Sequence, residues 1–221
     1  MKKAVTVAVP TYRRYDLLVQ MLIKSAEFGT RLPDRYYIID NGGTLDQASL
    51  GLPADRVVVH KPGKNLGVSA SWNHGHRTLT DHVIWACDDM ALHPPTVERL
   101  VEAAEAHPDV AFFFPEHNAG TMFGVYLMPQ WAFEKIGPFD ESFYPAYFED
   151  NDYARRIQLA GLKTMTVPGC GMSHFKSGTL ASYNAHEMAQ HHSNFERLRA
   201  YYCQKWGGPP GHEQFKTPFN R

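Results

Sequence analysis

The sequence predicts a mainly parallel, doubly wound α/β sheet that forms a single domain. Short apolar runs alternate with segments whose apolar side chains recur at helical spacing, which is the pattern of strands joined by helices. Of the 221 residues, 43% are hydrophobic and 20% are charged, a composition that supplies a sizeable core. A chain of this length fits one α/β domain of ordinary size.

The first half of the chain repeats a strand-then-helix pattern. Residues 4–9 are rich in Val and Ala and end at Pro10, and residues 16–26 follow with an apolar stripe of helical period. The next expected elements are strands at residues 36–39 and 57–59, a helix at 68–79 and a strand at 83–87.

The second half is expected to be more irregular. Its elements are a helix at residues 96–106, strands at 110–114 and 122–128, an aromatic segment at 139–148, a helix at 151–160, a strand at 163–167, a loop at 168–179 and a helix at 182–206. The Gly- and Pro-containing residues 207–221 are expected to form a loose tail.

Charge and cysteine content exclude several classes of protein. The net charge is −1 and no basic run occurs, so the chain lacks the footprint of a dedicated nucleic-acid binder. Cys87, Cys170 and Cys203 are an odd, widely spaced set, which argues against a disulfide framework and a zinc ribbon. No apolar stretch approaches the ~18 residues of a membrane span, and a cytoplasmic location is expected.

Polar residues follow three of the predicted strands directly. They are Pro10-Thr11-Tyr12, Asp40-Asn41 and Asp88-Asp89. Ligands of open α/β sheets bind at the carboxyl ends of strands, so these residues are expected to line one crevice. The adjacent carboxylates Asp88 and Asp89 repel each other unless a cation or fixed donors neutralise them. Mg²⁺ or Mn²⁺ with phosphate oxygens fits such a site, which points to a nucleotide diphosphate.

With these residues in view, the sequence resembles the inverting family 2 glycosyltransferases of the GT-A fold, from about residue 5 to residue 174. The matching segments are Val9-Pro10-Thr11-Tyr12-Arg13-Arg14, Ile39-Asp40-Asn41-Gly42, Asn65-Leu66-Gly67-Val68-Ser69, Cys87-Asp88-Asp89, Ile136-Gly137-Pro138-Phe139-Asp140-Glu141, Phe148-Glu149-Asp150-Asn151-Asp152 and Pro168-Gly169 leading to His174. The last three segments are the most specific.

The resemblance implies a donor site for a nucleotide-diphosphate sugar. Residues matching Pro10, Thr11 and Tyr12 shape the nucleotide pocket, and the carboxylate matching Asp40 accepts a hydrogen bond from the base. Uracil and thymine offer an N–H there, which favours UDP or TDP over GDP. The remaining nucleotide-sugar-binding residues implied by the resemblance are Arg14, Asn41, Asn65, Gly67, Asn73 and Asp88.

The resemblance also implies a site for Mn²⁺ or Mg²⁺. The family's Asp-x-Asp motif is here Cys87-Asp88-Asp89, so Asp89 is the expected ligand and Asp88 a ribose contact or a supporting group. His174 is expected to complete the metal site. Lys176, Ser177 and Thr179 follow in a loop that either meets the diphosphate or is simply solvated.

The resemblance makes Asp150 the expected catalytic base. Inverting transfer needs one group to take the proton of the acceptor hydroxyl while the nucleoside diphosphate departs. Asp150 lies at or near a predicted helix start, where free backbone N–H groups and the helix dipole are expected to keep it ionised. Asp152 is expected to pair with Arg155 in a structural role. Residues expected to contact acceptor or donor sugars are Gly124, Trp131 and Glu149.

Under this interpretation residues 1–206 form the GT-A domain. Its nucleotide-sugar half covers about 1–90 and its acceptor half about 91–180, with a C-terminal helix at about 182–206 and a tail at 207–221. The aromatic residues of segment 139–148 are compatible with a glycan, a protein or a modified nucleic acid as acceptor.

Two other functions stay open on the sequence alone. A nucleotidylyltransferase can share the nucleotide-binding sheet and acidic metal ligands, although residues 10–14 lack the Gly-rich phosphate loop that such enzymes usually have. A non-catalytic nucleotide-sugar-binding module is the second alternative. A P-loop is excluded by spacing, and the His186-Glu187 pair lacks the second His of a zinc protease motif.

Overall fold

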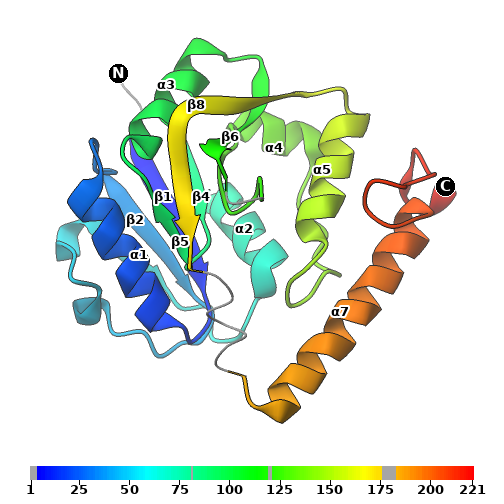
Figure 1. The fold of residues 1–221 in the computed structure, drawn as a ribbon, viewed down its shortest axis with the longest axis horizontal. Coiled ribbons are helices and arrows are strands. Elements are labelled where there is room, and N and C mark those ends of the chain that lie inside the picture. Colours follow the sequence, from blue (N-terminus) through cyan, green and yellow to red (C-terminus); the bar gives the residue numbers. More distant parts are fainter. Residues whose placement is uncertain (1–3, 81, 119–120, 176–182) are drawn as a thin grey trace.

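The computed structural model describes residues 4–80, 82–118, 121–175 and 183–221, and it confirms the expected α/β architecture (Figure 1). These residues build one eight-stranded sheet of order β3-β2-β1-β4-β7-β6-β8-β5. The strands are β1 (Val5–Thr11), β2 (Arg35–Asp40), β3 (Val57–His60), β4 (His82–Ala86), β5 (Met90–Leu92), β6 (Val110–His117), β7 (Val125–Leu127) and β8 (Lys163–His174).

The sheet combines a parallel half with a mixed half. The neighbours β3-β2-β1-β4 all pair in parallel, as the alternating strand–helix pattern predicts. Beyond them, β7 pairs antiparallel with β4 and β6, β8 pairs parallel with β6, and β5 pairs antiparallel with β8. The parallel half therefore brings the carboxyl ends of β1, β2 and β4 to one edge, where polar residues follow each strand.

Helices cover both faces of the sheet. They are α1 (Tyr15–Phe28), α2 (Gly67–Thr78), α3 (Thr96–Ala106), α4 (Gln130–Ile136), α5 (Glu149–Leu159) and α7 (Ala185–Trp206), with short 3-10 turns at Gln47–Leu50, Ala54–Arg56 and Pro218–Asn220. Side chains of α1 and α3 share one core cluster with the sheet, and those of α2, α4 and α5 share a second. The helix α7 lies on the side of the molecule that carries α5 (Figure 1).

The strand β8 is longer than the sequence indicates. The expected strand at 163–167 continues to His174, because residues beyond Pro168 pair with β6 and then with the short strand β5. The prediction of a loop over 168–174 is therefore wrong. Neither β5, with three residues, nor the seven-residue α4 was expected, because both are too short to show a clear period.

The C-terminal residues fold back on the domain, so the prediction of a loose tail is wrong for residues 207–215. The backbone N–H groups of Gln214 and Phe215 donate to the Trp206 carbonyl at 3.0 and 2.9 Å. The carbonyl of Phe215 accepts a hydrogen bond from Arg155 at 3.0 Å, and Glu213 accepts one from Tyr202 at 2.6 Å. Among the described residues, no helix has the length and apolar character that crossing a bilayer requires.

Candidate active site

The candidate site begins where β1 and β4 end. Thr11 is the last residue of β1, and Asp88 follows β4 after Cys87. The Thr11 Oγ1 donates to Asp88 Oδ2 at 2.7 Å, so the two neighbouring strand ends are joined across the crevice. Burial raises the pKa of Asp88 to about 7, with Thr11 opposing and the charge of Asp89 adding to the rise. The carboxyl group of Asp88 is thus held in a poorly solvated position directly beside the charge of Asp89.

Asp89 and His174 meet because of strand pairing. The antiparallel register of β5 and β8 sets Met90 opposite His174, and the Phe175 N–H donates to the Asp89 carbonyl at 2.8 Å. The Asp89 Oδ2 and His174 Nε2 therefore lie 2.9 Å apart. Residues separated by more than eighty positions thus provide one carboxylate and one imidazole at the same point.

Cys87 marks where the carboxylates of β4 and α5 converge. Burial raises the pKa of the Cys87 thiol, and so do the nearby charges of Asp89, Asp88, Glu149 and Asp150. A neutral thiol therefore lies near four carboxyl groups, at the position where the resembling family carries an Asp. The crevice combines both acidic segments that the sequence singles out.

The start of α5 holds two carboxyl groups with different environments. The Asn151 N–H donates to Asp150 Oδ1 at 2.7 Å, yet burial outweighs this bond and raises the pKa of Asp150. The backbone N–H groups at the helix start oppose this rise, as expected, and the ionisation of Asp150 at neutral pH stays a prediction. Glu149 is 7% exposed, and burial together with Asp150 raises its pKa to about 8. At neutral pH Glu149 is accordingly protonated, which leaves Asp150 as the ionisable partner that can carry the charge.

The raised pKa of Glu149 predicts a pH-dependent stability difference for Glu149→Gln. Between the ordinary value of 4.5 and about 8, the folded state holds a proton that the unfolded state has released, so wild-type stability falls as pH rises. Glu149→Gln lacks this titration, so its free energy of unfolding relative to that of wild type should rise by on the order of 1.4 kcal/mol per pH unit across that window and stay constant above pH ~8. Urea unfolding of both proteins at several pH values, without divalent cation, measures this difference. Glu102→Gln, at an exposed glutamate of α3, should show no such trend, and parallel pH profiles for wild type and Glu149→Gln would contradict the burial account.

A pocket of about 430 Å³ opens beside the carboxylates. Arg13 has a left-handed backbone, with φ of 64°, and its guanidinium lies 4.9 Å from the centroid of the Tyr12 ring. Asn41 joins the end of β2 to α2, since its amide donates to Ser71 and accepts from the Leu66 N–H. The pocket is lined by Tyr12, Arg13, Asn41, Gly42, Gly43, Thr44, Gly63, Lys64 and Asn65.

Arg14 lies at the edge of the acidic crevice. Two of its nitrogens donate to Asp16 at 2.9 and 2.7 Å, while Nη1 is buried without a partner among the described residues. The hydrogen bond to Asp16 raises the pKa of Arg14 despite burial, and the charges of Asp88 and Asp89 contribute. A buried, unpaired guanidinium nitrogen favours an anionic ligand nearby.

Asp40 is occupied by its own turn. Its carboxylate accepts from the Tyr15 hydroxyl at 2.7 Å and from the N–H groups of Gly42, Gly43 and Leu45 at 3.1, 2.9 and 2.9 Å, and it is fully buried. Because the carboxylate is fully buried, a nucleotide base could reach it only if this turn opened. The geometry therefore gives no support to the expected recognition of the base by Asp40.

Other residues expected in the site serve as packing or clamping groups. Asn73 is fully buried and holds Phe139 through both its amide oxygen and nitrogen, at 2.7 and 2.9 Å. Gly124 leaves room for Met90 and Met172, whose methyl groups would meet an added Cβ at 2.9 Å. Trp131 on α4 packs against the second core cluster.

Gly67 starts α2 with φ of 73°, and a side chain there would press on the Pro145 carbonyl at 2.7 Å. Pro10 pairs with Ile39 in the sheet and so fixes the approach of Thr11 to the crevice. Lys176, Ser177 and Thr179 lie outside the described residues.

A second, larger pocket of about 600 Å³ runs along α5. It involves Asn151, next to Asp150, and the folded-back C-terminal residues. Its charged lining residues are Arg155 and Glu213, so their charges balance. Helical spacing places Asp150 on the same face of α5 as Ala154, another lining residue.

Two cationic residues that line the pocket of about 430 Å³, Arg13 and Lys64, are not among the site residues expected from the sequence. Lys64 lies in Lys61-Pro62-Gly63-Lys64-Asn65, a segment whose spacing does not match a phosphate loop. Only its place in the fold could have marked Lys64 as a site residue, because it precedes the helix α2 at the same edge of the sheet as Asn41.

The residues at Asp89 and His174 fit a divalent cation. One carboxylate oxygen and one imidazole nitrogen within 2.9 Å are suitable donors for Mn²⁺ or Mg²⁺. Within the described part of the chain, no third His, Cys, Asp or Glu joins them in a metal-binding group. Substrate oxygens and water would therefore have to provide the remaining ligands.

Comparisons with known proteins agree with this architecture. The family model described as Glycosyl transferase family 2 matches residues 6–177, most of the chain. The structure is similar to that of the mannosyltransferase PcManGT from Pyrobaculum calidifontis in complex with GDP-Man and Mn²⁺, with a TM-score of 0.61 and 18% identity over 90% of this chain. It is also similar to GalNAc-T7 with UDP, GalNAc and Mn²⁺, with a TM-score of 0.63 and 12% identity over 78% of this chain. The matches span 65% and 44% of those two proteins, and no curated protein sequence matches the chain.

Proposed function

Because the chain belongs to glycosyl transferase family 2 and has the GT-A fold, we propose that it transfers a sugar from a nucleotide-diphosphate sugar to an acceptor hydroxyl, with inversion and with Asp150 as general base. The observation that carries this proposal is that four carboxyl groups, two that follow β4 and two at the start of α5, converge near Cys87 beside a pocket with cationic walls. One pocket for an anionic donor and one acidic centre are what such a transfer needs.

The donor is proposed to lie in the pocket between Tyr12 and Lys64. Arg13 and Lys64 can meet the diphosphate charge there, and Arg14 offers an unpaired nitrogen at the edge of the crevice. The preference for uracil or thymine depended on Asp40, whose oxygens are already occupied by its own turn. The proposal therefore leaves the choice of base to measurement.

Asp89 and His174 are the residues proposed to hold Mn²⁺ or Mg²⁺. When bound there, the cation would neutralise charge that develops on the departing nucleoside diphosphate. Asp88 is proposed to support the site, because its hydrogen bond to Thr11 fixes it beside Asp89.

Asp150 is proposed to take the proton of the acceptor hydroxyl as that oxygen attacks the anomeric carbon. The raised pKa of Asp150 makes it a stronger base than an exposed Asp, provided that it is ionised. Glu149, protonated at neutral pH, can donate a hydrogen bond to a sugar oxygen through its unpaired buried oxygen. Glu149 is protonated and Asp152 is paired with Lys205 and Arg156, so Asp150 is the carboxylate of α5 left for this role. A single displacement with inversion needs only one such base.

The pocket along α5 is proposed to receive the acceptor. Its balanced charges, Arg155 and Glu213, lack the positive excess with which proteins usually bind a nucleic-acid backbone. Among a glycan, a protein and a modified nucleic acid, a neutral glycan fits this lining best.

A thermal-shift panel of UDP, TDP and GDP, each with and without Mn²⁺, tests the proposed function. A ligand that binds only the folded state at about 100 times its Kd stabilises it by about 2.7 kcal/mol, which raises the Tm of a chain of this size by roughly 5–10 °C. We expect such a shift for at least one nucleotide, larger with Mn²⁺. A flat panel at millimolar nucleotide would contradict the proposal, and ATP in the same panel controls for general phosphate binding.

A further inference from the structure

The segment that leads into Asp150 has an unfavourable backbone conformation. Residues 140–148, here called the lip loop, end at Tyr147 and Phe148, with φ angles of 88° and 69°. Left-handed φ is rare for bulky aromatic residues and persists only where surrounding structure enforces it. Because Glu149 and Asp150 follow immediately, whatever enforces this conformation also sets the direction of the α5 start.

Apolar side chains of α7 help to hold the lip loop in this conformation. Phe143 and Phe148 of the lip loop share a separate buried cluster with Leu198, Tyr202 and Trp206 of α7. The Phe143 side chain is fully buried, and its ring centroid lies 6.3 Å from that of Tyr202. The ring of Phe148 lies 5.7 Å from the same tyrosine. The lip loop therefore packs on α7 rather than on the main core.

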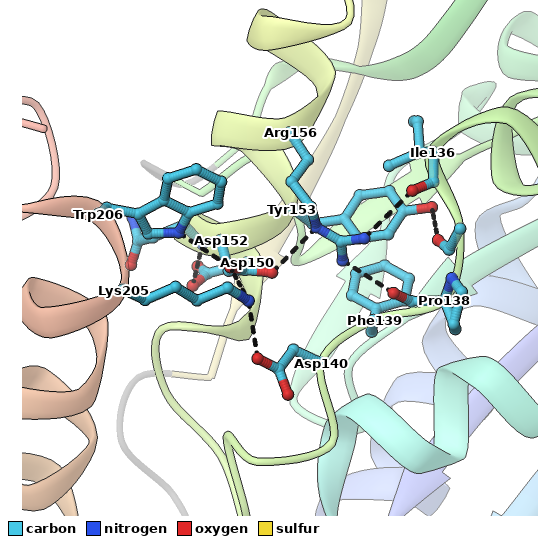
Figure 2. A network of polar contacts seen from close by, with 12 residues as sticks. Ile136, Pro138, Phe139, Asp140, Asp150, Asp152, Tyr153, Arg156, Lys205 and Trp206 are labelled. Carbon is cyan, nitrogen blue, oxygen red and sulfur yellow. Dashed lines mark hydrogen bonds and ion pairs between the residues drawn. The ribbon is translucent and has the colours of Figure 1, made fainter. Parts of the chain in front are cut away.

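One cation of α7 links both ends of the lip loop. Lys205 Nζ lies 2.7 Å from Asp140 Oδ2 at the start of the loop and 2.6 Å from Asp152 Oδ1 just past its end (Figure 2). Lys205 is 5% exposed and Asp152 fully buried, so both charges depend on this pairing. The same network includes Trp206 Nε1, which donates to Asp152 Oδ1 at 2.9 Å.

The carboxylates at the two ends are also held from other directions. Asp152 Oδ2 accepts from Arg156 Nε at 3.1 Å, so the expected pair between Asp152 and Arg155 is wrong and the i,i+4 neighbour takes that place (Figure 2). Asp140 Oδ2 accepts from the Tyr201 hydroxyl at 2.9 Å. Although burial opposes it, the Lys205 hydrogen bond helps to lower the pKa of Asp140 to about 2, so the pair is charged.

We propose that Lys205 is a positioning residue for catalysis: by binding Asp140 and Asp152 together, it holds the strained lip loop and thereby fixes Asp150 against the acceptor. This inference rests on the proposed role of Asp150. A misplacement of a reacting group by about 1 Å can lower a rate by about 100-fold, so a modest relaxation of the loop matters for turnover. The proposed nucleotide pocket is lined by residues that follow β1, follow β2 and precede α2, and none of the residues of this network is among them.

The test compares Lys205→Met with Leu100→Ala. Leu100 is a fully buried residue of α3 in the core cluster that α1 and α3 form with the sheet, away from α7. For each folded variant, turnover of the donor sugar and nucleotide Kd are measured at a temperature well below its Tm. We expect kcat of Lys205→Met to fall by about 10- to 100-fold with nucleotide Kd within about twofold of wild type. Leu100→Ala should lose thermal stability but keep kcat. An unchanged kcat in folded Lys205→Met, or a joint loss of kcat and nucleotide binding, overturns the proposal.

A second variant covers the case in which Lys205→Met does not fold. Asp140→Asn frees the start of the lip loop while Lys205 keeps its partner Asp152, and it should lower kcat by about tenfold with nucleotide binding retained. An unchanged kcat in that variant overturns the proposal. If the wild type turns over no nucleotide sugar, the proposed function fails on its own, and hydrogen exchange then tests whether Lys205 holds the lip loop.

Amides of residues 147–151 should exchange faster in Lys205→Met than in Leu100→Ala. If Lys205→Met does not fold, Asp140→Asn takes its place in this comparison. Equal exchange rates overturn the proposal.

Discussion

Asp150→Asn should reduce kcat for sugar transfer by about 10³-fold or more while nucleotide Kd stays within about twofold of wild type. The amide keeps the shape of the side chain but cannot accept the acceptor proton, and general-base catalysis typically contributes 10²- to 10⁴-fold. The carboxylate is absent from the nucleotide pocket lining, so binding of the donor nucleotide should survive. Steady-state kinetics and calorimetric titration with the nucleoside diphosphate measure the two effects.

The matched control for this substitution is Asp109→Asn. Asp109 precedes β6, and its side chain is 59% exposed in a surface pair with Lys163. Loss of that exposed pair should change stability little and leave kcat unaltered. Retained turnover in Asp150→Asn would contradict the assignment of Asp150 as the base. An equal loss of kcat in Asp109→Asn would show that the loss does not depend on the position of the substitution.

Removal of the divalent cation should lower kcat by about 10²-fold, and Asp89→Ala should raise the Mn²⁺ concentration needed for half-maximal activity by at least about tenfold. Asp89 provides the carboxylate of the proposed pair with His174, and an imidazole alone holds Mn²⁺ weakly. Chelation with EDTA followed by Mn²⁺ titration, monitored by release of nucleoside diphosphate, measures both effects.

His117→Ala serves as the comparison for the metal site. The side chain of His117 is 72% exposed at the end of β6, and its replacement should leave the Mn²⁺ titration unchanged. Equal activity of the wild type in EDTA and in Mn²⁺ would show that the natural motif Cys87-Asp88-Asp89, with Cys at its first position, works without a metal. In that case, among the described residues, the cations near the crevice that could neutralise the leaving group are Arg13, Arg14 and Lys64.

The sheet and the acidic crevice could be predicted because they follow from local pattern. Val-rich runs closed by polar residues mark buried parallel strands, and the edge at which β1 and β4 end brings Thr11 to Asp88 without further information. Asp150 was found through resemblance, since an acidic helix start is by itself a common structural feature.

The roles of Asp40 and Asn73 could not be predicted, because a polar side chain's partners depend on turn geometry and distant contacts. Four donors converge on Asp40 only once the turn after β2 has closed. Asn73 finds its partner in Phe139, 66 residues away. Lys205 was missed for a related reason: its two carboxylates come from different segments, and a lysine on a helix is usually solvated.

The most direct test of the central claim is the configuration of the sugar first released from its donor, followed by ¹H NMR. With an α-linked nucleotide sugar chosen from the thermal-shift panel, and with water as acceptor, a single displacement assisted by Asp150 predicts that the β anomer appears first and later equilibrates. The Asp150→Asn variant should release neither anomer at a comparable rate. Initial release of the α anomer would contradict inversion, and with it the assignment of Asp150 as the base.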